Sequence, residues 1–304
     1  MKFGNIEDKK LANLAFSLPA DNPANQALLA SLPVRSQVPC VYIGCSVWTD
    51  RSFLGKIYPQ GTATKDYLKL YSNQLNTVEL NATFYSTPAV AQINKWKASV
   101  ATGFKFCPKV PRSISHSNKL DQQDKNLHNF LTVIQHLGET LGTTFLQLPP
   151  DFQPNQMQKL QQLLALVPPA MPWAVEFRHP AWFSDPVAQQ EIFDCFRQRK
   201  ITAVISDVAG RRDILHQTIT NNCVFIRFRG YTQQSNNYTR LNAWIARIKQ
   251  WTEQGLEKVY FMLHETEKAF CIDLAMYLVK ALNQQMGLQL PMPRLVGQQA
   301  SLFS

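Results

Sequence analysis

Charged residues are scarce in this 304-residue sequence, and acidic residues are the scarcer kind. Asp, Glu, Lys and Arg make up 17% of the chain, against about 25% in an average globular protein. The 31 Lys and Arg residues exceed the 21 Asp and Glu residues, so the formal net charge is +10. This excess of positive charge favours an anionic partner, which could be a nucleic acid, a phosphorylated small molecule or a lipid headgroup.

Long apolar runs are also missing. No run approaches the ~20 residues that cross a bilayer, and the opening MKFGNIEDKKLANLAF lacks the apolar core of a signal peptide. The six cysteines are scattered, and no two have the two-residue spacing of a zinc knuckle or a redox site. We therefore expect a cytoplasmic protein with reduced thiols and no membrane partner.

A Gly-rich phosphate loop is absent after the first β-branched run, which counts against a dinucleotide-binding fold. Short β-branched or aromatic runs instead alternate with stretches of helical period. The expected strands are 40–46, 76–85, 103–111, 143–150, 172–180, 201–208, 223–231 and 258–265. Such alternation predicts a parallel sheet. Eight units match a single α/β domain of the (β/α)₈ TIM-barrel type, which takes ~250 residues, and a doubly wound open sheet is the alternative.

The pattern divides the chain into an N-terminal arm at 1–38, a barrel domain at 39–288 and a C-terminal tail at 289–304. One segment of the barrel breaks the alternation. The stretch 209–222 has few apolar residues, so we expect no regular helix of three or more turns between the sixth and seventh strands.

Polar side chains near the strand ends suggest a site. Barrel strands are buried on both faces and are normally apolar, yet polar residues occur near the C-terminal ends of most of these strands. They are Glu79, Lys105, Lys109, Gln147, Glu176, Arg178, His179, Asp207, Arg227 and His264. We expect them to point into the mouth of the barrel, where enzymes of this fold place their active sites. The alternative is an ion-pair network that only caps the barrel.

The residue types suggest roles. Glu79, Glu176 and Asp207 are candidate catalytic general bases, and Arg178 and Arg227 suit a phosphate or carboxylate. The substrate-binding candidates are Trp48, Tyr85, Lys105, Lys109, Gln147, Arg178, His179, Arg227 and His264. The three carboxylates could hold a divalent metal, but Lys and Arg crowd the same space, so we predict no metal and no other cofactor.

These features favour an enzyme acting on a phosphorylated or nucleic-acid substrate. A hydrolase of phosphodiesters, resembling a nuclease, and a sugar-phosphate enzyme both remain open. The aromatic Trp48 and Tyr85 could stack on nucleobases or sugars, or could simply close the barrel mouth by packing. The alternative to an enzyme is a non-catalytic module that binds nucleic acid, with an affinity that falls as salt rises.

Six ordered motifs carry a family resemblance. GCSVW, VELNATFY, FKFCPKVPRSISH, LGTTFLQLPPDF, EFRHPAWF and FIRFRG resemble the YecE-like family, also called domain of unknown function seventy-two. The likeness runs from about residue 41 to the C-terminus. It implies a TIM barrel and no assigned activity. Many members read Phe-Asn-Asn where this chain has Leu263-His264-Glu265.

The end of the chain suggests a partner. Gly287 is expected to end the last helix, and the prolines after it predict an extended arm that leaves the barrel. The last residues resemble the pentapeptide by which bacterial polymerases and repair proteins bind the sliding clamp of DNA polymerase. The matching residues are Gln299, Ser301, Leu302 and Phe303. We expect Leu302 and Phe303 to fill an apolar pocket of the clamp, or else to pack on this barrel's own surface.

Overall fold

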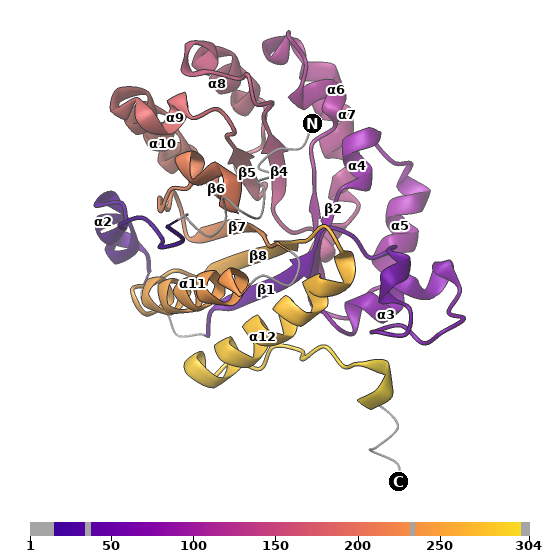
Figure 1. Ribbon diagram of the computed structural model, residues 1–304. Helices are drawn as coiled ribbons and strands as arrows, with labels where there is room; N and C mark the ends of the chain where they lie inside the picture. Colours follow the sequence, from indigo (N-terminus) through magenta and orange to yellow (C-terminus); the bar gives the residue numbers. More distant parts are fainter. Residues whose placement is uncertain (1–14, 34–37, 232–234, 299–304) are drawn as a thin grey trace.

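The computed structural model describes residues 15–33, 38–231 and 235–298. Eight parallel strands form a nearly closed barrel with helices outside it, which confirms the (β/α)₈ TIM-type fold (Figure 1). The strands are β1 Cys40–Cys45, β2 Thr77–Leu80, β3 Lys105–Pro108, β4 Thr144–Gln147, β5 Trp173–Glu176, β6 Thr202–Val208, β7 Cys223–Arg229 and β8 Lys258–His264. Strands adjacent in sequence pair, except that β3 and β4 meet only through isolated bridges, and β8 pairs with β1. Between β3 and β4, Val110 N donates to Phe145 O at 3.0 Å.

Helices connect most of the strands. The α-helices are α2 Ala24–Ser31, α3 Tyr67–Ser72, α4 Ala82–Tyr85, α5 Val90–Ala98, α6 Arg112–Ser115, α7 Asp124–Gln135, α8 Met157–Ala165, α9 Ala181–Ser184, α10 Pro186–Arg199, α11 Asn236–Glu253 and α12 Lys268–Met286. Single 3₁₀ turns are η1 Arg51–Phe53, η2 Thr64–Asp66, η3 Leu120–Gln122, η4 Gly138–Thr140, η5 Pro154–Gln156, η6 Ala209–Ile214 and η7 Val296–Gln298. None of the helices in the described ranges combines the length and apolar character needed to cross a membrane.

Every predicted strand is present, but the second is wrong beyond Leu80. The residues expected to continue it, Ala82–Tyr85, form helix α4 instead. Thr83 Oγ1 lies 2.7 Å from the carbonyl oxygens of both Leu80 and Lys109 and accepts the Lys109 N–H at 3.0 Å. A side-chain hydroxyl that takes up the next backbone partners in this way ends strand pairing.

The hydrophobic side chains form two layers. A small inner core fills the barrel: Tyr42, Cys107, Phe145, Ala174, Val204, Cys223, Phe225, Tyr260 and Met262. A larger outer core lies between the sheet and the helices, and the buried Phe130 of α7 and Trp244 of α11 belong to it. Because strand residues alternate between these layers, the parity of a residue decides whether its side chain faces the barrel axis or the helices.

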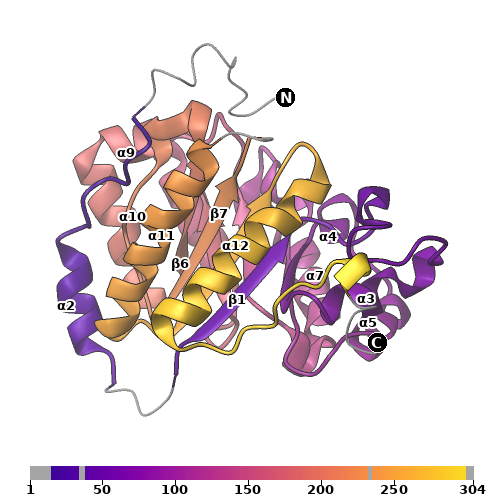
Figure 2. The same ribbon diagram turned by 60° about the horizontal axis from the view of Figure 1, so that its bottom comes forward.

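The barrel wall between β6 and β7 has no α-helix, as predicted. Only η6 follows β6, and residues 215–220 continue as buried chain without regular structure. Helix α2 of the N-terminal arm lies beside α11 at this place (Figures 1 and 2). Asn25 Nδ2 donates to Gln217 O at 2.7 Å, and Asn25 Oδ1 accepts from Ile219 N at 2.8 Å. The arm therefore supplies the cover that the missing helix would have given.

The tail after Gly287 is extended, as predicted, but the described part does not leave the barrel. Arg294 N donates to Gln74 Oε1 at 2.6 Å, and Val296 N donates to Lys56 O at 2.8 Å. Residues 288–298 therefore lie along the barrel wall. The proposed clamp-binding residues, Gln299, Ser301, Leu302 and Phe303, lie outside the described residues, so clamp binding stays a prediction.

Replacing Asn25 with Ala should destabilise the protein by about 1–3 kcal/mol. The change leaves the buried amide of Ile219 without its partner, which costs about this much, whereas Gln217 O keeps the N–H of Asn22 at 3.2 Å. Urea unfolding measures the loss. The exposed neighbour Gln26 is the control, because its replacement by Ala should change stability by less than about 0.5 kcal/mol. Equal effects of both variants would contradict the docking role of α2.

Stability should fall as the pH drops from 6.5 toward 4, because His216 is buried in its neutral form. Its Nε2 lies 3.0 Å from Val204 O and its ring stacks on Phe183. Burial lowers the pKa of His216 to about 4, so the unfolded chain binds the proton first. The loss should total about 3 kcal/mol across this window and should not appear above pH 6.5. Urea unfolding at several pH values gives the free energy of unfolding as a function of pH. Between pH 6.5 and 4 this free energy should fall less steeply for His216→Gln than for the unaltered chain.

Candidate functional site

Seven side chains from seven strand ends meet at the C-terminal mouth of the barrel. We name them the mouth cluster: Glu79, Lys109, Gln147, Glu176, Ser206, Arg227 and His264. Each lies an even number of residues from an inward-facing position of its own strand. Because side chains alternate between the two faces of a strand, each of them points toward the barrel axis. The sequence predicted this meeting for six of the seven.

Arg227 of β7 joins two carboxylates from β2 and β5. Its Nε donates to Glu79 Oε1 at 2.7 Å and its Nη2 donates to Glu79 Oε2 at 3.1 Å. Its Nη1 donates to Glu176 Oε2 at 2.6 Å. Both glutamates are at most 1% exposed, so one guanidinium neutralises charges that would otherwise be very costly to bury.

From Glu176, hydrogen bonds continue the cluster toward β3 and β6. Gln147 Nε2 donates to Glu176 Oε2 at 2.7 Å, and Ser206 Oγ donates to Glu176 Oε1 at 3.0 Å. The first bond turns the amide oxygen of Gln147 toward Lys109, whose Nζ donates to it at 2.9 Å. Lys109 Nζ also lies 4.0 Å from the ring centroid of Phe84. Gln147 thus separates the ammonium from the carboxylate.

The environment shifts the pKa values of this cluster in opposite directions. Burial alone would raise the pKa of Glu176, but Arg227 and Arg178 outweigh it and lower that pKa to about 2. Arg227 and His264 likewise hold the pKa of Glu79 well below its usual value against the effect of burial. Burial, together with the charge of Arg227, lowers the pKa of Lys109 to about 8. Both glutamates therefore stay ionised, and Lys109 titrates near neutral pH.

Glu79 orients the imidazole of His264. His264 Nε2 lies 2.8 Å from Glu79 Oε1. Arg227 Nη2 lies 3.3 Å from the same nitrogen. Because an ionised carboxylate only accepts and its contact is the shorter one, we assign the hydrogen to Nε2 and the lone pair of the neutral ring to Nδ1. Burial lowers the pKa of His264 below its usual value. A neutral imidazole held by a carboxylate is suited to accept a proton.

A third cation lies close to the cluster. Arg178, in the loop after β5, places Nε 3.5 Å from Glu176 Oε1. Within the cluster itself, the charges of Lys109 and Arg227 match those of Glu79 and Glu176. The side chains of Arg178 and His264 each stay 20% exposed, which gives solvent a way to the cluster.

Asp207 does not join the cluster, so its predicted inward placement is wrong. It follows Ser206 by one residue and therefore faces the helices instead of the axis. Its carboxylate forms an ion pair with Arg240 at 2.8 Å, accepts from Trp244 Nε1 at 2.8 Å and bonds Arg212. Two polar residues, Ser206 and Asp207, stand side by side at the end of this strand, and only one of them can face the axis.

Four further predicted residues lie away from the cluster. Lys105 is the first residue of β3, at the opposite end of the barrel, and donates to Glu139 O. Trp48 packs edge-on against Trp96 of α5, in the outer layer. Tyr85 lies on α4 and is 84% exposed. His179 Nδ1 accepts from Ala181 N at 3.1 Å, so this side chain supports the start of α9.

A metal site does not emerge from the described residues. In residues 15–33, 38–231 and 235–298, no three His, Cys, Asp or Glu side chains are arranged to hold a metal ion. The oxygens of Glu79 and Glu176 are directed at Arg227, His264, Gln147 and Ser206 instead.

A cavity of about 390 Å³ opens beside the cluster, between the loops after β3 and β4. We name it the rim cavity; Arg112, Ser115, His116, Ser117, Asn118, Pro149, Pro150, Asp151, Phe152 and Gln156 line it. The His116 ring lies 5.5 Å from the Phe84 ring, which covers Lys109. Burial and the charges of Arg112, Lys109 and Arg178 lower the pKa of His116, so the region is electropositive. Arg112 was not among the predicted site residues, because it follows a strand instead of ending one.

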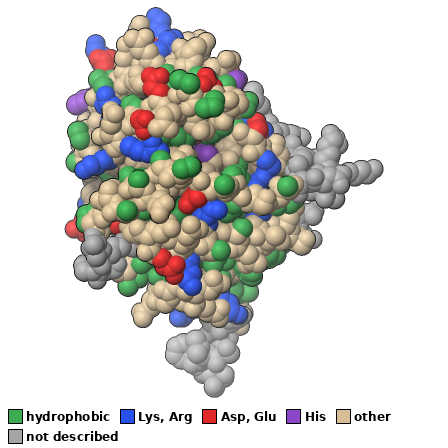
Figure 3. Space-filling view, turned by 90° about the vertical axis from the view of Figure 1, so that its left-hand side faces the viewer, with side chains coloured by type: hydrophobic (Ala, Val, Ile, Leu, Met, Phe, Trp, Pro, Cys, Tyr) green, Lys and Arg blue, Asp and Glu red, His purple; other side chains and the backbone are tan. Residues whose placement is uncertain are grey.

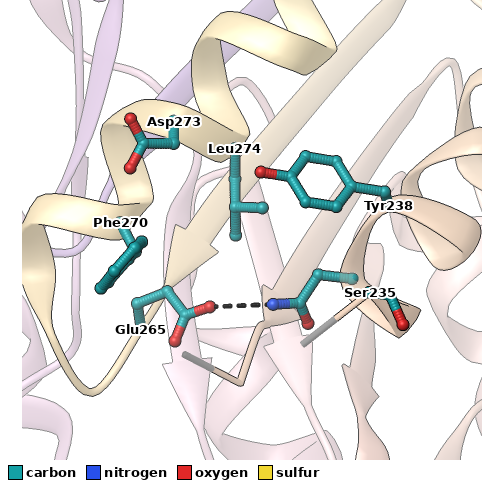
Figure 4. Close-up of a pocket in the computed structure, with 7 residues that line it drawn as sticks. Ser235, Tyr238, Glu265, Phe270, Asp273 and Leu274 are labelled. Carbon is teal, nitrogen blue, oxygen red and sulfur yellow. Dashed lines mark hydrogen bonds between the residues drawn. The ribbon is translucent and has the colours of Figure 1, made fainter. Parts of the chain in front are cut away.

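A second cavity, of about 380 Å³, lies between the first turns of α11 and α12 (Figure 4). Glu265 faces it from the residue after β8 and accepts from Asn237 Nδ2 at 3.2 Å. Burial raises the pKa of Glu265 to about 7. Asp273 on its edge is already paired with Lys56 at 2.6 Å. His264 and Glu265 are neighbours in sequence and serve opposite sides of the barrel wall.

Comparison with known proteins gives a family and a fold. The profile of a family described as "Protein of unknown function DUF72" matches residues 42–296. The UPF0759 protein YecE of Escherichia coli K12 is 29% identical over 254 residues, which cover 78% of this chain and 92% of YecE. The UPF0759 protein YunF of Bacillus subtilis is 26% identical, over 64% of this chain and 71% of YunF. A crystal structure of a DUF72 family protein of Enterococcus faecalis V583 superposes with a TM-score of 0.64 at 19% identity, over 84% of this chain and 98% of that one.

Replacing Asp207 with Asn should destabilise the fold by about 3–5 kcal/mol. The change leaves the fully buried guanidinium of Arg240 without its counter-ion, and an uncompensated buried charge costs about this much. Urea unfolding measures the loss. Asp213, an exposed acid paired with Arg211, is the control, because its replacement by Asn should cost less than about 1 kcal/mol. A stable Asp207→Asn variant would contradict the structural role of this carboxylate.

Proposed function

The chain belongs to the DUF72 family of proteins of unknown function, and we propose that it is an enzyme acting on a small phosphorylated substrate at the barrel mouth. The observation that carries the proposal is a pair of cations beside the mouth: Lys109 meets the carboxylates only through Gln147, and Arg112 on the rim cavity forms no ion pair within the described residues. A dianionic phosphate would compensate this positive charge.

The rim cavity is the place where the phosphate would bind. Arg112 lies on its edge with an exposed side chain, and within the described part of the chain this side chain forms no ion pair. Ser117 and Asn118 line the same cavity and offer a hydroxyl and an amide as further donors. A substrate anchored there would extend past His116 and Phe84 toward Lys109.

The chemistry that the cluster supports is proton transfer. Glu79 and Glu176 are poor general bases, because Arg227 holds their pKa values low. His264 is the better base, since it is neutral at pH 7, partly exposed and oriented by Glu79. Glu79 and Glu176 would then position His264 and Arg227 instead of reacting themselves, which changes the roles expected from the sequence.

A small substrate fits the depth of this site better than a nucleic-acid duplex does. Lys109 is 8% exposed and the side chain of Arg227 is 11% exposed, so a duplex backbone could not reach them. On the face of the barrel shown in Figure 3, Lys and Arg side chains are interspersed with Asp and Glu side chains. That face carries no continuous basic patch of the kind that tracks a phosphate backbone.

Arg112→Gln should weaken the binding of a sugar phosphate about tenfold, the usual effect of losing one charge-assisted contact. Isothermal titration with ribose 5-phosphate, with ribose and with inorganic phosphate gives the affinities. Arg199, an exposed arginine at the other end of the barrel, is the matched control, and Arg199→Gln should bind like the unaltered chain.

The catalytic part of the proposal has its own readout. Proton NMR in D₂O on a panel of sugar phosphates should show a carbon-bound hydrogen exchanging with solvent, and His264→Gln should slow this exchange at least a hundredfold. Binding of a phosphate without exchange of any carbon-bound hydrogen would contradict the enzyme and indicate a protein that only binds phosphates. Binding of single-stranded DNA that exceeds binding of every small phosphate would favour the nucleic-acid module instead.

A further inference from the structure

Lys109 is an unusual lysine because it is buried beside acids without touching them. Its side chain lies at the end of β3 inside the barrel mouth, and the residue is 8% exposed. Within the described part of the chain it forms no ion pair; its Nζ meets the neutral amide oxygen of Gln147 at 2.9 Å and the ring of Phe84 at 4.0 Å. A lysine that served only to neutralise the site would be expected to contact Glu176 directly.

The neighbours of Lys109 fix its position at both ends of the side chain. The backbone N–H donates to Thr83 Oγ1 at 3.0 Å, and its carbonyl lies 2.7 Å from the same oxygen. At the other end, the bond from Gln147 Nε2 to Glu176 Oε2 at 2.7 Å keeps the amide oxygen turned toward Nζ. A reactive group held by packing and by a fixed acceptor is preorganised for chemistry.

The surroundings also favour the neutral amine. Burial and the charge of Arg227 act against the ammonium form and lower the pKa of Lys109 to about 8. Gln147 Oε1 accepts an N–H from either form of the amine and so does not require the charge. Desolvated lysines next to another cation are the ones that act as nucleophiles toward carbonyl carbon.

We propose that Lys109 is a nucleophile that forms an imine with the carbonyl carbon of an aldehyde or ketone entering the mouth from the rim cavity. The inference rests on the proposed function only for the phosphate that would anchor such a substrate at Arg112. It names the substrate class more narrowly, as a phosphorylated carbonyl compound.

The step balances without a further reactant. Lys-NH₃⁺ first releases one proton to water, and the neutral Nζ donates its lone pair to the carbonyl carbon. One N–H proton moves from nitrogen to the carbonyl oxygen, giving a neutral carbinolamine. The hydroxyl then takes back the released proton, the carbon–oxygen bond breaks and the oxygen leaves as water. Lys-NH₃⁺ and the carbonyl compound are thereby converted to a protonated imine and one water. The positive charge stays on nitrogen, next to Gln147 and within reach of the two glutamates' field.

Reductive trapping tests the proposal on the full chain. The protein is incubated at pH 7.5 with glyceraldehyde 3-phosphate or with glyceraldehyde, each with sodium cyanoborohydride, and the modified lysines are quantified by peptide mass spectrometry. Lys105, four residues earlier on the same strand but at the opposite end of the barrel, is the internal reference. We expect Lys109 to be modified at least about tenfold faster than Lys105, because burial and the charge of Arg227 favour the neutral amine of Lys109 and Gln147 holds it in place.

The outcomes separate this proposal from the phosphate site. Modification of Lys109 no faster than that of Lys105, by either aldehyde, overturns the imine even if ribose 5-phosphate binds through Arg112. Fast modification of Lys109 by both aldehydes alike supports the imine and argues against the phosphate anchor. A strong preference for glyceraldehyde 3-phosphate that is lost in Arg112→Gln supports both. Because both lysines are compared in the unaltered chain, the test does not depend on whether a Lys109 variant can fold.

Discussion

The mouth of this barrel depends on one buried arginine that serves two carboxylates. Arg227 donates to Glu79 on one side and to Glu176 on the other, and both acids lie in the interior of the barrel. Without the guanidinium neither acid could stay ionised at that depth, and without the acids the arginine would lack partners. Everything else in the cluster takes its orientation from this pair of bonds: Glu79 directs the proton of His264, and Glu176 turns the amide of Gln147.

The sequence predicted the fold well because the barrel is built from a repeated rule. Strands that alternate with helices leave a parallel sheet as the simple solution, and eight such units close. The exceptions arose where one side chain overrides the local pattern. Thr83 ends β2 by taking up the carbonyls of Leu80 and Lys109, which no strand propensity reveals. The role of α2 could not be predicted, since nothing local in 24–31 indicates that Asn25 meets a chain segment almost two hundred residues later.

The candidate site was predicted in part, and parity explains the difference. Around Glu79, Glu176 and Arg227, polar and apolar residues alternate along the strand. The sequence could therefore predict that these three side chains face the barrel axis. Asp207 directly follows another polar residue, so the sequence does not show which of the two faces the axis, and the structure directs Asp207 to Arg240 and Trp244. Its neighbour Ser206 points inward instead and donates to Glu176.

The docking of α2 also orders events in time during synthesis. The arm emerges from the ribosome first, but the backbone that receives Asn25 is made 192 residues later. At ordinary rates of translation that interval is roughly 10–40 s. Throughout it the arm has no docking surface, because the residues that receive it are not yet made. Closing the wall is therefore a late, long-range event with a loop-closure cost, and the arm must stay available until the chain has passed β6.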